Sequence, residues 1–105
     1  MSDQQKAAIR GAILRYLDLV YPQAVTLRLL HGELDLFGFT VLMEDLSFHV
    51  AALAEKELVW IMPQTGLRDG VLVRLVKITA KGIDFQNALN RASAESPQSV
   101  DRETG

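Results

Sequence analysis

The chain has 105 residues, of which 49% are apolar, and it contains no cysteine. This length suffices for one packed domain with a modest core, and the missing cysteine excludes disulfides, thiolate metal sites and cysteine nucleophiles. The net charge is −2, but residues 1–92 hold ten Lys/Arg and ten Asp/Glu and are therefore neutral. A neutral domain is not a strong nonspecific binder of phosphates, because that affinity grows with the number of phosphates neutralised.

Both ends of the chain are polar. The first ten residues, MSDQQKAAIR, lack the apolar run of a secretory signal, and runs such as LVWIM are too short to cross a bilayer. We therefore expect a cytoplasmic protein. Residues 93–105, SAESPQSVDRETG, are polar and without periodicity. We predict a folded domain over residues 1–92 and a disordered polar tail over 93–105.

Three helices are predicted in the first half of the chain. The first covers residues 3–20, with Ser2 and Gln5 as a capping box, and the second covers residues 27–37, with Thr26 as its cap and Gly38 as its end. The third covers residues 41–57. Apolar residues at helical spacing predict a buried stripe on each. The stripes are Ile9, Ile13, Leu17 and Val20; Leu27, Leu30, Leu34 and Phe37; and Leu42, Leu46, Val50 and Leu53.

The period then changes from helical to alternating. LVWIMPQ and VLVRLVKI read as two strands of a hairpin, joined by the turn QTGLRDG. Thr79 caps a last helix, AKGIDFQNALNRA, in which Phe85, Leu89 and Ala92 share a face. Both faces of the predicted hairpin are largely apolar. Either the N-terminal helix or a partner is expected to cover the face turned away from the core.

This order of elements resembles the winged-helix family over residues 2–92. The resemblance rests on the short turn Gly38–Thr40, on LAEKELV, and on VKITAKGIDF, which is similar to the (L/I)T-x-K-G strand end of many bacterial winged-helix regulators. It implies an α+β fold with a three-helix core, a two-stranded β-hairpin wing and a C-terminal helix. It also implies a non-enzymatic DNA-binding protein of transcription-regulator type. In that family the third helix enters the major groove and the wing contacts the backbone or minor groove.

The charges favour the wing over the third helix as the phosphate-binding part. Residues 40–57 carry a net charge of −3, with no Arg or Lys between Thr40 and Glu55, whereas residues 63–82 carry +3. The wing cations are also compatible with an ordinary solvated surface. The residues expected to contact double-stranded DNA are Arg68, Arg74 and Lys77 on the wing, Arg28 on the second helix, and Met43, Glu44 and Ser47 on the third helix.

The same asymmetry favours a protein contact, because an acidic helix and a basic wing are complementary. One protomer's wing could meet another's third helix, and we predict a homodimer. The residues expected at a protein interface are Phe48, Ala51, Glu55, Trp60, Val71 and Val73. The alternative function is therefore a winged-helix interaction or assembly module that does not bind DNA specifically.

Several other polar or aromatic residues are interpreted as structural. His31 and Asp35 share a side of the second helix, but two ligands do not close a metal site, so neither metal nor cofactor is expected. His49 borders the core face and is expected to be partly buried and hydrogen-bonded. Ser47 lacks a recognisable base, so a hydrolase is not expected. Trp60 is interpreted as a core or interface aromatic rather than the wall of a ligand pocket.

Overall fold

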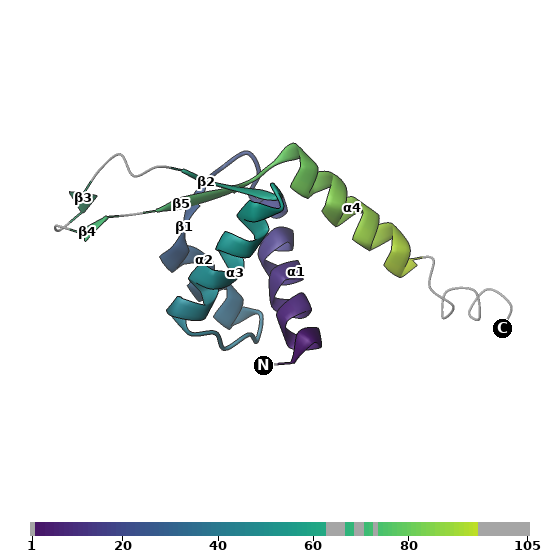
Figure 1. The fold of residues 1–105 in the computed structure, drawn as a ribbon, viewed down its shortest axis with the longest axis horizontal. Helices are drawn as coiled ribbons and strands as arrows, with labels where there is room; N and C mark the ends of the chain where they lie inside the picture. The colour runs from purple at the N-terminus through teal and green to yellow at the C-terminus, as the bar shows by residue number, and fades with distance from the viewer. Residues whose placement is uncertain (1, 63–66, 69–70, 73, 95–105) are drawn as a thin grey trace, which may run out of the picture.

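The computed structural model describes residues 2–62, 67–68, 71–72 and 74–94, with the backbone alone for 67, 68, 71, 72, 93 and 94. Helices α1, α2 and α3 lie together on one side of a small sheet, the β3–β4 pair extends away from them, and α4 leaves the other end (Figure 1). The elements are α1 (Asp3–Leu19), β1 (Val25–Thr26), α2 (Leu27–Leu36), α3 (Met43–Glu55), β2 (Val59–Met62), β3 (Leu67–Arg68), β4 (Val71–Leu72), β5 (Leu75–Ile78) and α4 (Ala80–Ala94). This is the predicted α+β winged-helix arrangement.

Local capping explains where the first two helices begin and end. The Ser2 hydroxyl accepts from the Gln5 N–H at 3.1 Å, and the Gln5 side chain accepts from the Ser2 N–H at 3.0 Å, which is the predicted capping box. Thr26 caps α2 by accepting from the Leu29 N–H at 3.0 Å. Gly38 follows α2 with a φ of +94°, a left-handed conformation that glycine adopts without steric cost.

The sheet has three strands rather than the predicted two. Strand β5 lies in the centre, antiparallel to β2 on one side and to β1 on the other. The sequence gives no sign of β1, because two residues have no periodicity and its partner lies some fifty positions later, at Val25↔Val76. The predicted turn also contains strand structure, since β3 pairs with β4. Residue 73 and most of the turn lie outside the described residues.

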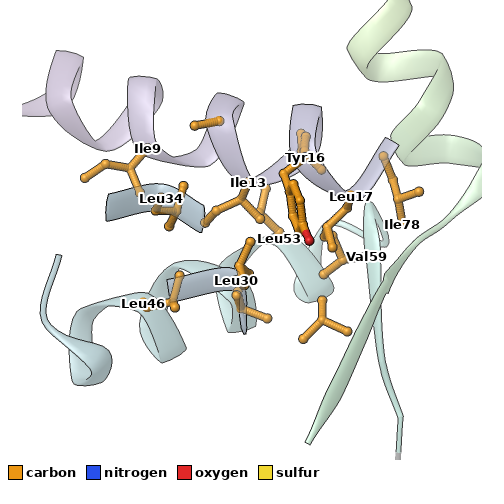
Figure 2. Packing of buried hydrophobic residues seen from close by; sticks show 14 of the residues in the cluster. Ile9, Ile13, Tyr16, Leu17, Leu30, Leu34, Leu46, Leu53, Val59 and Ile78 are labelled. Carbon is orange, nitrogen blue, oxygen red and sulfur yellow. The ribbon is translucent and has the colours of Figure 1, made fainter. Parts of the chain in front are cut away.

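The core lies between the three helices and one face of the sheet (Figure 2). Alternation along the strands sends Val59, Val76 and Ile78 into this core, where each is at most 3% exposed. The helical side chains that meet them include Ile9, Ile13, Leu17, Leu30, Leu34, Leu46, Val50 and Leu53, all buried. The predicted stripes are therefore largely correct, with exceptions at helix ends.

Two of the predicted core residues are exposed. Phe37 is the C-cap of α2 and is 49% exposed. Leu42 is 70% exposed, because α3 begins at Met43 and Leu42 is its extended N-cap. Val41 occupies the core position instead and is 5% exposed. The Val41 carbonyl oxygen lies 2.6 Å from His31 Nε2. This contact holds residue 41 in the connection between helices, so the helix starts later than the apolar spacing predicts.

Hydrogen bonds of Thr79, the residue before α4, join the start of α4 to the segment that follows α3. The Thr79 hydroxyl donates to the Glu57 carbonyl at 2.7 Å and accepts from the Gly82 N–H at 2.9 Å, while the Thr79 N–H donates to the Leu58 carbonyl at 3.1 Å. Gly82 is buried, and a Cβ there would overlap the Leu58 carbonyl oxygen and lie 2.7 Å from Ile78 Cγ1. In the sequence TAKG, Thr79 thus caps α4, and Gly82 allows the backbone of α4 to lie close to the Leu58 carbonyl.

Replacing Gly82 by alanine is expected to destabilise the fold by about 1–3 kcal/mol, because the added methyl group meets backbone that cannot move aside. Urea unfolding followed by circular dichroism measures this loss. Gly11→Ala on α1 is the matched control, since nothing lies within 4 Å of its Cβ position. That variant is expected to gain up to about 1 kcal/mol from helix propensity. Equal stabilities for the two variants would contradict the packing role of Gly82.

Candidate nucleic-acid interface

The first turns of α3 present the residues predicted to lie nearest to DNA bases. Met43 is 40% exposed, Glu44 is exposed and Ser47 is half-buried. Their positions follow from helical geometry, since the opposite side of α3 places Leu46, Val50 and Leu53 in the core. The structure therefore brings these three residues to one end of an exposed helix that has no cation along its length.

The predicted phosphate-binding cations are distributed over three elements. Arg74 is exposed and directly precedes β5. Lys77 is half-buried on β5, and its Nζ lies 5.5 Å from the centroid of the Tyr21 ring. The Arg68 backbone belongs to β3, and its side chain lies outside the described residues. Only Arg74 is thus shown as an exposed cation of the wing.

Arg28 lies on α2 and not on the wing or on α3. It is exposed and lines a groove of about 440 Å³ together with Leu29, Gly32 and Leu36. Leu29 and Leu36 are 48% and 79% exposed, so the groove is apolar along the helix. Arg28 therefore lies on a different helix from the residues that were predicted to lie nearest to DNA bases.

The residues predicted at a protein interface fall into two groups. Phe48, Ala51 and Glu55 are all exposed and lie with Glu44 along one side of α3, with Phe48 at 77% exposure. Trp60 is 52% exposed on β2, a different element. The Val71 side chain and the whole of Val73 lie outside the described residues. The exposure of Trp60 shows that it is not a core residue of the monomer.

The sequence pattern identified an apolar face of α4 but did not predict that this face is exposed. Phe85 and Leu89 are each 44% exposed, while the buried positions of this helix are Gly82 and Gln86. Their spacing of four residues marks a common face, but spacing alone does not show whether that face meets the core. The structure turns it outward.

His49 joins α3 to α1. It is 5% exposed, and its Nδ1 accepts a hydrogen bond from Arg10 Nε at 3.2 Å. Burial lowers the pKa of His49 below its ordinary value, the Arg10 and Lys6 charges lower it further, and Asp45 opposes them. The predicted hydrogen bond of His49 is confirmed, and the side chain is buried rather than partly buried as predicted.

Metal and membrane features are absent from the described part of the chain. Among those residues no group of three or more His, Asp or Glu side chains is placed to hold a metal ion. The helices seen over residues 2–62 and 74–94 include none that is long and apolar enough to span a bilayer.

No protein-family model matches the sequence, and neither does any curated protein compared with it. The fold is similar to a solved structure described as a PadR-like transcription factor from Bacteroides fragilis. The TM-score is 0.79 over 96% of this chain and 94% of that chain, at 18% sequence identity. At this identity the likeness shows a shared winged-helix fold, including the order and placement of the elements.

The Arg10–His49 contact predicts a stability that depends on pH. His49 is disfavoured as a cation in the folded chain but titrates near its ordinary pKa of 6.5 when unfolded. The unfolded state therefore takes up more protons as the pH falls, so the His49 contribution is complete above about pH 6.5 and decreases below it. Urea midpoints at about pH 7.5 and pH 5.5 measure this difference.

The control for this prediction is a pair of glutamine variants. His49→Gln is expected to lose the part of the pH dependence that lies between these two values, because it carries no titrating group. His31→Gln is expected to keep it. A wild-type pH dependence in the His49 variant would show that other groups cause the effect.

Proposed function

We propose that this protein is a non-enzymatic, DNA-binding transcription regulator that acts in the cytoplasm as a homodimer. The observation that carries the proposal is the similarity of nearly the whole fold to a PadR-like transcription factor, at a TM-score of 0.79. Fold similarity of this extent covers α3, the wing and α4 together, which are the parts that a DNA-binding winged helix needs.

In the proposed complex the first turns of α3 lie in the major groove. Met43 offers an apolar contact for a thymine methyl group, Ser47 offers a hydroxyl to either kind of base, and Glu44 accepts from a cytosine amino group. Arg68 and Arg74 bind phosphates from the wing, with Arg28 and Lys77 as further cations. Because base contacts from α3 lack arginine and lysine, most of the affinity comes from the wing.

The dimer of this proposal forms through α4. Phe85 and Leu89 present an apolar strip on a helix that extends away from the core (Figure 1). Burying such a strip against its copy removes apolar surface from water, which is the main driving force of association. A twofold dimer also places two reading helices on two DNA half-sites.

Charge reversal on the wing tests the DNA contact. In the variant Arg68→Glu/Arg74→Glu, binding to a mixed-sequence duplex at low salt is expected to weaken at least tenfold, and the slope of log affinity against log salt to decrease by about 2. Fluorescence anisotropy of a labelled duplex over a salt series measures both quantities.

The matched control for charge reversal is Arg15→Glu/Arg91→Glu. It changes the net charge equally but at exposed positions on α1 and α4. This control is expected to weaken binding only slightly. Equal losses in both double variants would mean that net charge, not the wing, governs the affinity, and unchanged affinity of the wing variant would exclude a wing contact.

A second candidate function is a protein-interaction module that uses α3. Phe48 is 77% exposed and lies between Glu44 and Glu55 on the outer side of the helix. A large apolar residue flanked by carboxylates fits a basic protein surface with an apolar anchor site, such as the wing of a second copy. In this candidate the dimer forms between α3 and the wing, not through α4.

Two serine variants distinguish the dimers. Phe85→Ser/Leu89→Ser is expected to convert the wild-type dimer to a monomer in light scattering at micromolar concentrations, with unchanged helical circular dichroism. Phe48→Ser is expected to remain dimeric. The reverse result would support the second candidate and contradict the α4 dimer, and a monomeric wild-type protein would contradict both.

A further inference from the structure

The outer face of the three-stranded sheet carries an aromatic and cationic row. The register pairs Trp60 with Lys77, so the two side chains lie next to each other across β2 and β5. Lys77 Nζ in turn lies 5.5 Å from the Tyr21 ring centroid. The row therefore runs from one aromatic ring, through an ammonium group, to a second aromatic ring.

This row is accessible and its surroundings contain no negative charge from the sheet. Trp60 and Tyr21 are 52% and 49% exposed. The same face carries the next row of the register, Met62↔Leu75 and Thr26↔Leu75, without a carboxylate. The strand residues of alternate position, such as Val59 and Val76, face the core instead.

The expectation that the N-terminal helix covers this face is wrong. Helix α1 packs on the core side of the sheet (Figure 2). From the segment after α1, Tyr21 reaches Lys77 on the outer face. The Tyr21 ring orders Lys77 through a cation–π contact. Since an ammonium group has three donors, this contact leaves donors available for an anion.

We propose that the outer face of the sheet binds single-stranded nucleic acid, with a base stacked on Trp60, a neighbouring base on Tyr21, and the intervening phosphate on Lys77. Exposed aromatic rings beside cations on a sheet are suited to this ligand, because every base has a π-face and the backbone is anionic. Paired bases in a duplex do not expose those faces. This site lies apart from the duplex contacts proposed for α3 and Arg68, shares Lys77 with the proposed duplex cations, and does not rest on the proposed function.

Trp60 is the one tryptophan in the 105 residues, so its fluorescence reports on this face directly. Titration with a short oligothymidylate is expected to quench it to saturation. Heparin supplies the negative charge without bases, and a blunt duplex supplies bases that are already stacked, so both are expected to quench it little. An oligouridylate tests whether the sugar matters: similar quenching means that DNA and RNA share the site.

Variants locate the binding independently of the tryptophan signal. By anisotropy of a labelled oligothymidylate, Trp60→Leu is expected to weaken binding roughly tenfold or more, as loss of a stacked base does. Tyr21→Leu is expected to weaken it similarly, while Tyr21→Phe, which keeps the ring, is expected to match wild type. Trp60→Leu is expected to leave duplex affinity unchanged.

The outcomes separate this inference from the proposed function. If the protein binds duplex DNA but oligothymidylate does not quench Trp60, the inference is wrong and the proposed function is unaffected. If oligothymidylate quenches Trp60 but the protein does not bind duplex DNA, the proposed function is wrong and the inference is supported. Equal quenching by heparin reduces the site to an anion contact and overturns stacking. If acrylamide fails to reach Trp60 in a dimeric wild-type protein, a second copy covers the face and the inference is wrong.

Discussion

The arrangement of the molecule depends on the close contact between Gly82 and the Leu58 carbonyl, secured by the two hydrogen bonds of the Thr79 hydroxyl. The end of α3, the start of β2, the end of β5 and the start of α4 all meet at this point. Glu57, which directly precedes Leu58, has a φ of 63°, a left-handed conformation that is unusual for a residue with a side chain. Because the elements are joined through backbone atoms here, the direction of α3 relative to the sheet and to α4 is set by geometry that side-chain repacking cannot easily change.

Sequence patterns predicted this fold well wherever the determining contacts are local. The capping box of Ser2 and Gln5 and the glycine after α2 need only neighbouring residues, and both are seen as predicted. The predicted burial of Leu42 was wrong and β1 was missed, because long-range contacts determine both. His31 reaches the Val41 carbonyl, and Val25 pairs with Val76. Local periodicity contains no information about either contact.

The candidate surfaces were less predictable than the fold. Alternation along β2 puts Trp60 on the other face of the sheet from Val59 and Ile61, but it does not tell which face meets the helices. The face of α4 that contains Phe85 and Leu89 illustrates the same limit. Helices α2, α3 and α4 and the sheet each expose large apolar or aromatic side chains. A winged helix with an anionic α3 is thus better suited to several moderate contacts than to one strong electrostatic contact.

The packed side of α4 contains a buried polar side chain. Gln86 is 4% exposed, and its Oε1 has no hydrogen-bond partner among the described residues. Desolvating an amide oxygen without replacing its hydrogen bond costs about 1–3 kcal/mol, which offsets part of the apolar stabilisation around it. The helix is therefore anchored at its first turn by Thr79 and Gly82, and its packed side contains one polar group whose burial is not compensated. Tilting α4 about Thr79 would rehydrate that amide, so hydration of Gln86 would return part of the free energy needed to move the helix.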